Sequence, residues 1–379
     1  MDQSKIRAWY AHRQGLDGSL DGKSAAEVLG RTGWARSMGS TAPYLTLFSR
    51  AGLSREDVDE SVAKLEIHEL PSVRGCTYVL PASDFALGLT LGKGFDGEMK
   101  VAEKLGVTEK EIDKLCGTVI AALAKGPLDP EGLRDATGRA VRHLGVEGQK
   151  KGLTTTLPLA LGKLQISGDI RRIPINGRLD QQRYRYTLWR PNPLRGFKMP
   201  ADEAYTQLAR RFFSWIGPAT IAEFQWFSGL SVKAVNAAVE PLKLVPLKTG
   251  DDRLLLPDDR AKLEAFKIPD DPQYVLVARL DSIALLRRDL KGMLDPRDLD
   301  RQVSVDKTTK PLGELADLPS HAILDRGRLV GLWEYDTSTN SIAWTAFVKK
   351  DKALQEAVAR TEQYVYRASR GVRALARAR

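Results

Sequence analysis

Arginines are the residues of this sequence whose type and spacing most clearly indicate a chemical role, the binding of phosphate. Six of them fall between residues 169 and 190: Arg171, Arg172, Arg178, Arg183, Arg185 and Arg190. This segment has the pattern of a β-hairpin, so we expect Arg183 and Arg185 on one face and Tyr184 and Tyr186 on the other. Guanidinium groups bind phosphate well, whereas the tyrosines would pack inward. The alternative is a solvated hairpin without a binding role.

The net charge of the sequence also indicates binding to an anionic partner. The 379 residues include 58 Lys or Arg and 48 Asp or Glu, which leaves a formal net charge of +10. The excess lies in the hairpin segment and in the tail after Tyr366, whose arginines are Arg367, Arg370, Arg373, Arg377 and Arg379. Positive charge concentrated in this way is typical of proteins that bind a polyanion, and it predicts an affinity that falls with added salt.

Other kinds of chemistry lack the residues that they need. The two cysteines, Cys76 and Cys116, are too few for a disulfide framework and fit a reducing cytoplasm. The histidines have neither the spacing of metal ligands nor that of a nucleophilic triad: His12, His68, His143 and His321. The sequence has no signal-peptide segment and no apolar run long enough to span a bilayer. We therefore expect a cytoplasmic protein that uses no metal, no cofactor and no membrane.

The elements that position the arginines belong to a repeat. Gly126-Pro127 is followed by Gly138, and Gly217-Pro218 is followed at the same spacing by Gly229. In each copy an amphipathic run precedes the Gly-Pro pair and a helix-like segment follows the later glycine, which is the order of a helix-turn-helix. After the first copy, residues 152–168 are predicted to form a second helix and residues 169–190 the hairpin. This part of the chain is therefore predicted to be a winged helix.

Four further candidates stand before or at the start of the predicted helix 152–168: Lys150, Lys151, Thr154 and Thr155. Hydroxyl and backbone N–H groups at a helix N-terminus favour anions, so these residues are predicted to contact phosphate. Ordinary N-capping explains the threonines almost equally well.

The predicted fold class is α+β with helices dominant, built from tandem winged helix-turn-helix units with small β-hairpin wings. The predicted segments are an N-terminal winged-helix-like unit (1–100), a second unit with the arginine-rich hairpin (101–195), a third unit with C-terminal hairpins (200–350), and a C-terminal helix with the basic tail (351–379). Within the first unit we expect a helix from Ser54 to about Leu70 and a strand at 74–80. The stretch after Leu294 is polar, and a strand pair is expected around Gly331.

Several short motifs resemble those of a known family. RQGL at 13–16 resembles its opening helix signature, RGCTYVLPASDF at 74–85 resembles its segment RGTxHxVPAxD, and ILDRGRLVGLWEYD at 323–336 is similar to its hairpin VxxDGRVVGxW. The two Gly-Pro helix breaks fit as well, and the landmarks keep the family's order along nearly the whole chain. The chain thus resembles the AlkZ/YcaQ-like family of bacterial winged-helix DNA glycosylases.

The resemblance implies a fold, an activity and a partner. Tandem winged-helix motifs are expected around a concave DNA-binding face. The expected activity is that of a monofunctional DNA glycosylase, a hydrolase that cleaves the N-glycosidic bond of bulky alkylated or crosslinked bases in DNA repair. The expected partner is double-stranded DNA, damaged or alkylated, bound by a monomer at the nucleoid.

The sequence departs from the family at the catalytic motif. The family has Gln-x-Gln or Gln-x-Asp after its second helix, and alignment on the helix LTLFSR at 45–50 places that motif on Arg36, Ser37 and Met38. Glycosidic cleavage needs an electron-rich group near the developing cation and a group that holds water. Arginine only donates hydrogen bonds and is always charged, and a thioether is a weak acceptor. The family's device for water activation is therefore missing, and Tyr78 replaces a frequent histidine.

Three explanations are open. The acceptor has moved to Asp84 or Glu69, which flank segment 74–80; or Arg36 acts on the leaving base or a phosphate while Ser37 holds the water; or the scaffold has lost its chemistry. In the last case the protein is a non-catalytic winged-helix DNA-binding protein for damage sensing or transcriptional regulation. Asp84 also has a simpler alternative role as a helix cap.

Overall fold

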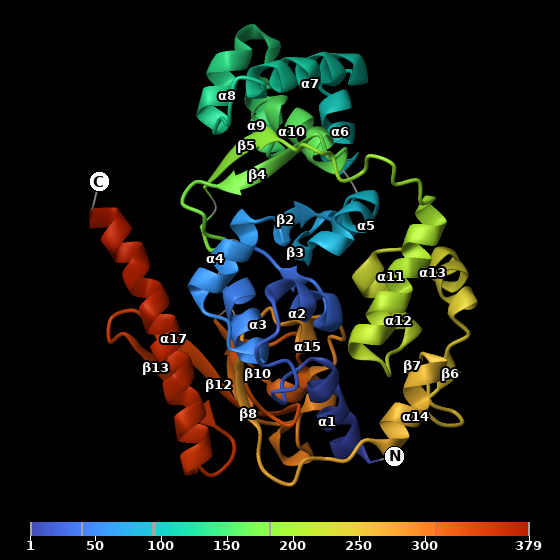
Figure 1. The fold of residues 1–379 in the computed structure, drawn as a ribbon. Helices are drawn as coiled ribbons and strands as arrows, with labels where there is room; N and C mark the ends of the chain where they lie inside the picture. Colours follow the sequence, from blue (N-terminus) through green and yellow to red (C-terminus); the bar gives the residue numbers. More distant parts are fainter. Residues whose placement is uncertain (1, 39–40, 93–95, 182, 306, 378–379) are drawn as a thin grey trace.

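The computed structural model describes residues 2–38, 41–92, 96–181, 183–305 and 307–377. It is an α+β fold in which helices dominate and the sheets are small and antiparallel (Figure 1). None of the helices in these ranges is long and apolar enough to cross a bilayer. Side chains beyond Arg367, and with them most of the basic tail, lie outside the described part of the chain.

The first part of the chain consists of helices around a three-stranded sheet. The helices are α1 (Gln3–Arg13), α2 (Ala25–Thr32), α3 (Ala42–Ala51), α4 (Arg55–Ala63) and α5 (Phe85–Thr90), and the strands are β1 (Ala35–Arg36), β2 (Ile67–Pro71) and β3 (Thr77–Pro81). The strand order is β1-β3-β2.

The helix expected from Ser54 to about Leu70 is wrong in its second half. Ser54 caps α4 through a capping box, as the sequence indicates, but the helix ends at Ala63. Leu65 then adopts a left-handed backbone conformation with φ 56°, and the chain enters β2, which pairs with β3. Pairing with a neighbouring strand thus overrides the local preference for helix.

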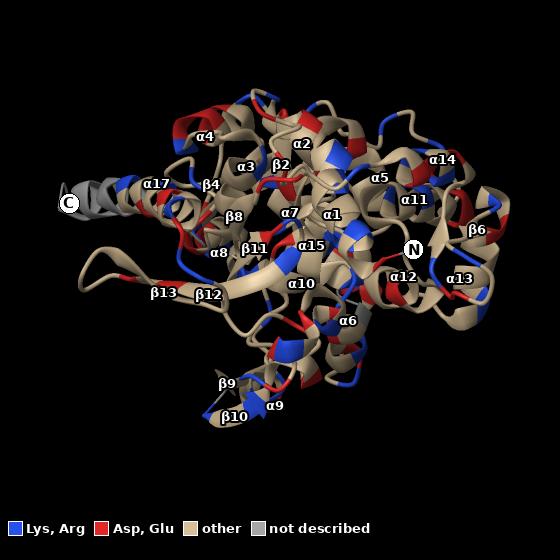
Figure 2. Cartoon of the chain, turned by 90° about the horizontal axis from the view of Figure 1, so that it is seen from below, with Lys and Arg blue, Asp and Glu red and all other residues tan. Residues whose placement is uncertain are grey.

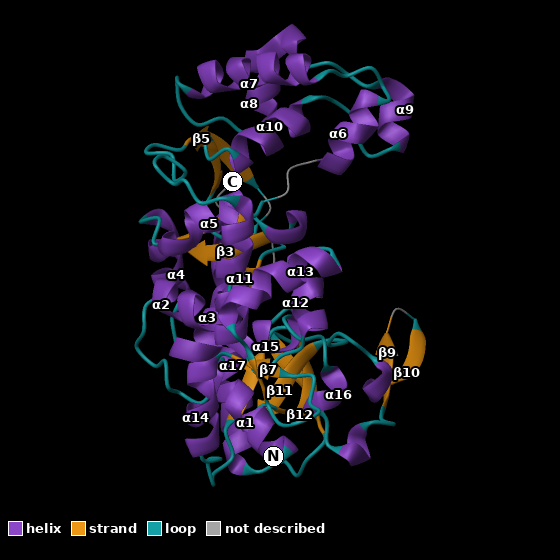
Figure 3. Cartoon of the chain, turned by 90° about the vertical axis from the view of Figure 1, so that its right-hand side faces the viewer, coloured by secondary structure: helices purple, strands orange, loops and turns teal. Residues whose placement is uncertain are grey.

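The next part of the chain is a separate lobe, at the top in Figures 1 and 3. It contains α6 (Asp96–Glu103), α7 (Glu109–Leu123), α8 (Pro130–Thr137), α9 (Gly145–Lys150), α10 (Leu157–Ile166) and the hairpin of β4 (Ile170–Pro174) with β5 (Tyr184–Leu188). Its buried residues form a hydrophobic cluster of their own, from Ala102 to Ile170.

The third part repeats this order of elements. It contains α11 (Ala201–Ile216), α12 (Ile221–Ser228), α13 (Val232–Val239), a short hairpin of β6 (Val245–Pro246) and β7 (Leu254–Leu255), and α14 (Pro257–Ala265).

The two copies share a detail that follows from the Gly-Pro break. The residue after each Gly-Pro pair forms an antiparallel bridge with the second strand of the following hairpin, Leu128 with Tyr186 and Ala219 with Leu254. Each copy therefore has a helix, then an extended residue, then two or more helices and a hairpin. The extended residue pairs with the second strand of that hairpin.

The C-terminal part is a four-stranded sheet covered by one long helix. It contains β8 (Tyr274–Val277), α15 (Ser282–Leu285), α16 (Leu290–Met293), β9 (Gln302–Val305), β10 (Thr308–Pro311), β11 (His321–Asp325), β12 (Arg328–Asp336), β13 (Ser341–Ala346) and α17 (Lys352–Arg377). The sheet order is β13-β12-β11-β8.

The structure adds a hairpin to one expectation for this part and confirms the other. The polar stretch after Leu294 contains the separate hairpin β9–β10, which projects from the body of the molecule (Figure 3). The strand pair expected around Gly331 is confirmed, because β12, which contains Gly331, pairs with β13; the chain also reverses at Arg326-Gly327, which pairs β11 with β12. A Cβ atom on Gly331 would lie 2.6 Å from the backbone oxygen of Thr345, so the glycine permits close approach of β13.

Cores are shared between segments that are distant in sequence. Trp9 of α1 donates a hydrogen bond to the backbone oxygen of Gly217, and the Tyr10 hydroxyl donates to that of Pro218. Arg50 of α3 and Asp281 form an ion pair with an N–O distance of 2.7 Å and fully buried side chains. Segments 1–100 and 200–350 are therefore packed into common cores, and the division of the chain at those boundaries stays a prediction.

Candidate active site and nucleic-acid interface

The motif residues lie at the end of the edge strand β1. Arg36 is paired with Tyr78 of β3, and the backbone N–H of Ser37 donates to the Thr77 oxygen at 3.1 Å. The Arg36 guanidinium lies 5.2 Å from the centre of the Tyr78 ring, whereas the Ser37 hydroxyl donates to Glu69. Successive residues of a strand point to opposite faces. Arg36 and Ser37 therefore do not converge on one water molecule. Met38 is 54% exposed.

Glu69 of β2 accepts a hydrogen bond from Ser37, the middle residue of the motif position. Its Oε1 atom accepts hydrogen bonds from the Ser37 hydroxyl at 2.6 Å and from the Tyr184 hydroxyl at 3.3 Å. Its Oε2 atom is buried and has no hydrogen-bond partner among the described residues. The nearest cation is Arg172, whose Nη2 atom lies 3.9 Å from Oε2. A buried carboxylate with an unoccupied acceptor atom thus stands next to the family's motif position.

Asp84, the other carboxylate considered, has a structural role. It is fully buried, its Oδ2 atom accepts from the Trp34 indole at 2.8 Å, and its Oδ1 atom is paired with Arg211 at 2.6 Å. Both oxygens are thus engaged away from the first backbone N–H groups of α5, so the helix-cap interpretation is wrong. The same contacts leave it poorly placed to activate water, because a paired buried carboxylate is held by its cation.

Burial fixes the protonation states of the rings near this cluster. It raises the pKa of Tyr184, with Glu69 as a further cause, and it raises the pKa of Tyr78 to about 12. Burial, and then the charges of Arg171 and Arg172, lower the pKa of His68 to about 3. Both tyrosines therefore remain hydrogen-bond donors at neutral pH, and His68 is neutral and donates no acidic proton.

The arginine-rich hairpin has two distinct faces, as expected. Arg183 and Arg185 are exposed, and the register pairs Arg185 with Ile173 and Arg172 with Tyr186. By strand alternation Arg171, which is half-buried, shares the face of Arg185.

Arg172 shares the face of the tyrosines, and its guanidinium lies 4.7 Å from the centre of the Tyr184 ring. This face is directed to β2, so Arg172 joins Glu69, Ser37 and Tyr184 in one group of contacts, the Glu69 cluster. Its assignment to the phosphate-binding face is therefore corrected.

Arg178 also needs correction as a candidate for phosphate binding. It is only 5% exposed and forms an ion pair with Asp180 at 2.7 Å. The adjacent Leu179 is buried against the first unit, and its backbone N–H donates to the Tyr44 hydroxyl at 2.9 Å. Arg178 therefore helps to fasten the loop between β4 and β5 to helices α3 and α4.

The candidates before the predicted recognition helix lie outside its first turn. The backbone of 142–144 pairs with that of 154–156, which keeps the chain extended, and α10 begins only at Leu157. Thr154 and Lys151 are exposed, Thr155 is half-buried, and exposed Lys150 is paired with Glu147 at 2.8 Å. These residues therefore precede the helix, which starts later than the predicted residue 152, and their contact with phosphate stays a prediction. The alternative of N-capping by Thr154 and Thr155 is not found, because the N-cap position of α10 is Thr156, whose side chain makes no capping hydrogen bond.

One cationic and aromatic stack was missed by the sequence analysis. Trp226 of α12 contacts two guanidinium groups, that of Arg74 at 4.4 Å and that of Arg288 at 4.7 Å from its ring centre. Arg74 has a left-handed backbone conformation, φ 60°, that aims it across the boundary between the first and third parts. The helical spacing of Trp226 with Trp215, Phe224 and Phe227 predicts a core position. In the structure Trp226 is partly buried against the core, and the sequence does not indicate its two arginine neighbours.

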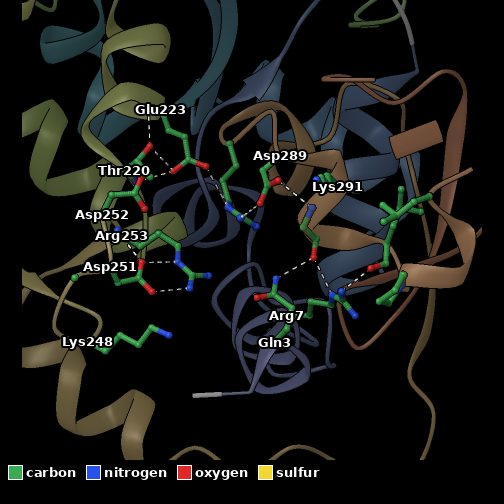
Figure 4. A pocket seen from close by; sticks show the side chains of 16 residues that line it. Gln3, Arg7, Thr220, Glu223, Lys248, Asp251, Asp252, Arg253, Asp289 and Lys291 are labelled. Carbon is green, nitrogen blue, oxygen red and sulfur yellow. Dashed lines mark hydrogen bonds and ion pairs between the residues drawn. The ribbon is translucent and has the colours of Figure 1, made fainter. Parts of the chain in front are cut away.

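A separate cavity of about 700 Å³ lies between α1, α12, the β6–β7 loop and residues 287–299 (Figure 4). Its charged groups largely neutralise one another: Arg253 is paired with Asp251 at 2.8 Å, and Arg287 lies 2.6 Å from Asp289 and 3.5 Å from Glu223. None of its described lining residues belongs to the Glu69 cluster. Across the described residues we find no group of three His, Cys, Asp or Glu placed to hold a metal ion.

Comparison with known proteins places the chain in a family and shows a similar fold. The model of the family described as DNA glycosylase AlkZ-like matches residues 36–364, which include the motif position 36–38, the arginine-rich hairpin and the C-terminal sheet. The solved structure of the DNA glycosylase AlkZ from Streptomyces sahachiroi is similar over 96% of this chain and 97% of that chain, with a TM-score of 0.69 and 21% identity. The search of curated proteins found no match. Since the family model spans most of its length, the chain belongs to the AlkZ-like family of DNA glycosylases.

Proposed function

We propose that this protein hydrolyses the N-glycosidic bond of bulky alkylated bases in damaged double-stranded DNA, and that it acts as a monomer on the chromosome in the cytoplasm. The observation that carries the proposal is the Oε2 atom of Glu69, which is buried, lacks a hydrogen-bond partner among the described residues and belongs to a carboxylate bonded to Ser37. This carboxylate supplies the acceptor that the replaced glutamines do not.

The chemistry needs only groups of this chain and water. The bond between C1′ and the base nitrogen breaks and its electron pair stays on the base, so that a purine alkylated at N7 leaves as a neutral molecule without a general acid. The sugar then resembles an oxocarbenium ion, which a nearby carboxylate stabilises. Water bonds to C1′ and transfers a proton to Glu69, which acts as general base.

Two surface features support binding to duplex DNA. Arg183 and Arg185 are exposed on the outer face of the β4–β5 hairpin, where they are free to meet phosphate groups. The β9–β10 hairpin projects from the molecule and carries exposed Lys307 and Lys310 (Figure 3). A projecting hairpin of this kind is suited to act as a wedge that separates a damaged base from its neighbours. Elsewhere basic and acidic residues are interspersed (Figure 2), so local clusters, not a uniformly positive surface, direct binding.

The test is release of the base from duplex DNA that carries an N7-alkylguanine. Glu69→Leu removes both oxygens, and we expect base release to fall by about 10²–10⁴-fold. Glu69→Gln keeps an acceptor oxygen and is expected to retain a measurable part of the rate. Glu66→Leu is the matched control, because Glu66 is exposed near the start of the same strand.

The outcomes separate the possible functions. A Glu69→Leu protein that folds, binds DNA and releases the base at the wild-type rate excludes Glu69 as the acceptor. A wild-type protein that binds duplex DNA and releases no base from any alkylated or crosslinked substrate identifies the chain as a DNA-binding protein without catalysis.

A further inference from the structure

The β4–β5 hairpin connects the phosphate-binding arginines to the Glu69 carboxylate. Its strand β4 lies beside β2, where the upper lobe meets the three-stranded sheet (Figure 1). Arg183 and Arg185 are exposed, whereas Tyr184, which stands between them in sequence, reaches Glu69. Because neighbouring residues of a strand alternate between faces, the position of the arginines and that of the Tyr184 hydroxyl are set by the same backbone.

Two hydroxyl groups from different parts of the chain orient Glu69. Ser37, at the end of β1, and Tyr184, on β5, both donate to the Oε1 atom. With Oε1 occupied in this way, Oε2 is the atom left to accept a hydrogen bond from water. Arg172 and Tyr184 of this hairpin are charged or titratable groups that contact Glu69. Among the described residues, Tyr186, two residues farther along β5, is influenced by the charge of Glu69 but is not hydrogen-bonded to it.

The hairpin is held in one position against the first unit. The loop that joins its strands buries Leu179 in the first unit's core, and Arg55 of α4 forms an ion pair with Asp180 of this loop. In the same loop, the hydroxyl of Tyr44 accepts a hydrogen bond from the Leu179 N–H. Since the loop is fixed, a phosphate group bound by Arg183 and Arg185 acts on a hairpin whose inner face already touches the carboxylate.

We infer that Tyr184 is a positioning residue for hydrolysis: its hydroxyl holds the Glu69 carboxylate in the orientation that accepts water, and the wing of the second unit thereby completes an active site whose acceptor comes from the first unit. The inference rests on the proposed function and deepens it. It makes the hairpin a part of the catalytic apparatus as well as a DNA contact, since one β-strand serves both.

The experiment compares Tyr184→Phe with Tyr186→Phe under single-turnover conditions on duplex DNA that contains N7-alkylguanine. Both substitutions remove one hydroxyl from the same face of the same strand, but only Tyr184 donates to Glu69 in the structure. Loss of a hydrogen bond to a charged group corresponds to about a tenfold or larger decrease in rate. We expect that decrease in Tyr184→Phe with an unchanged Kd for DNA, and wild-type behaviour in Tyr186→Phe.

A second readout does not depend on turnover. With 13C-labelled glutamate, the side-chain carboxyl signal of Glu69, assigned by its absence in Glu69→Gln, is expected to move in Tyr184→Phe and to stay in place in Tyr186→Phe. An active wild-type enzyme whose rate is unaffected by Tyr184→Phe, or equally reduced by Tyr186→Phe, overturns the positioning role alone. A wild-type protein without base release overturns the proposed function, and an unmoved carboxyl signal overturns the Tyr184–Glu69 contact itself.

Discussion

Ser37 and Glu69 meet diagonally across the central strand β3. Ala35 and Glu69 are both paired with Val79, so Ser37, two residues beyond Ala35, points to the same face as Glu69 and donates to its Oε1 atom at 2.6 Å. The contact joins an edge strand to a strand that follows two helices later in the sequence. It gives Ser37 a defined role at a position where the residue type alone offers little chemistry.

The first prediction concerns this hydrogen bond. Ser37→Ala removes one of the two donors to Oε1, and a hydrogen bond to a charged group is worth about 1.5–3 kcal/mol. We expect single-turnover base release to fall by roughly ten- to a hundredfold, because 1.4 kcal/mol is tenfold in rate. Ser37→Thr keeps the hydroxyl and is expected to keep most of the rate. Equal rates for Ser37→Ala and wild type would contradict the role given to this contact.

The second prediction concerns the exposed arginines of the hairpin. Replacing Arg183 and Arg185 together by Ala is expected to weaken binding to unrelated duplex sequences by a similar factor. The slope of log K against log salt should become shallower by about 2, since each phosphate contact contributes about 0.9. The control replaces Lys64, which directly follows α4, and Lys352, at the start of α17, and so removes the same charge. A slope that changes equally in both double variants would show that only net charge matters.

Local patterns are sufficient to predict much of this fold. The Gly-Pro repeat, the helices on both sides of it and the two faces of the arginine-rich hairpin depend on residues close together in sequence, and the structure confirms them. The strand β2 was missed because its partner β3, and not its own sequence, determines its conformation.

The contacts of the candidate active site depend on residues that are even farther apart in the sequence. Glu69 was recognised only as a carboxylate near the right strand, and its bond to Tyr184 requires the hairpin of another lobe to lie beside β2. Nothing in the spacing of residues 69 and 184 predicts that contact. Arg172 and Arg178 show the same limit, because both were assigned to DNA by residue type and both are engaged within the protein.

The third prediction tests the structural role of Asp84. Asp84→Asn weakens its ion pair with Arg211, and a buried charge that loses its partner destabilises a protein by about 3–5 kcal/mol. Here the loss is expected to be smaller, because Arg211 is one-third exposed and regains water. We expect a lower Tm and, at a temperature where the variant is folded, the wild-type rate of base release. A folded Asp84→Asn protein that releases no base would make Asp84 part of the chemistry.

The fourth prediction concerns the buried ion pair of Arg50 and Asp281. Both side chains are fully buried, and Gln14 accepts a further hydrogen bond from Arg50 at 3.0 Å. Arg50→Met leaves the Asp281 carboxylate without its cation and is expected to lower the free energy of unfolding by about 3–5 kcal/mol. The double variant Arg50→Met/Asp281→Leu is expected to be more stable than Arg50→Met alone, as measured by urea denaturation. A double variant less stable than either single one would show that the polar pair itself is needed.

The fifth prediction concerns pH and His68. Burial holds the pKa of His68 at about 3 in the folded protein, below its ordinary value near 6.5 in the unfolded chain. Between these values the unfolded chain binds a proton that the folded protein does not, so stability decreases as pH falls through this range. Carboxylates also titrate there, and the His68 contribution is therefore the difference between wild type and His68→Phe in Tm measured from pH 7 to pH 4. As the pH decreases, we expect the Tm of His68→Phe to rise relative to the Tm of the wild type, because phenylalanine has no proton to gain. A phenylalanine suits the site, since His68 packs against Phe85 and Trp189. A difference independent of pH would mean that His68 takes up its proton in the folded state as readily as in the unfolded one.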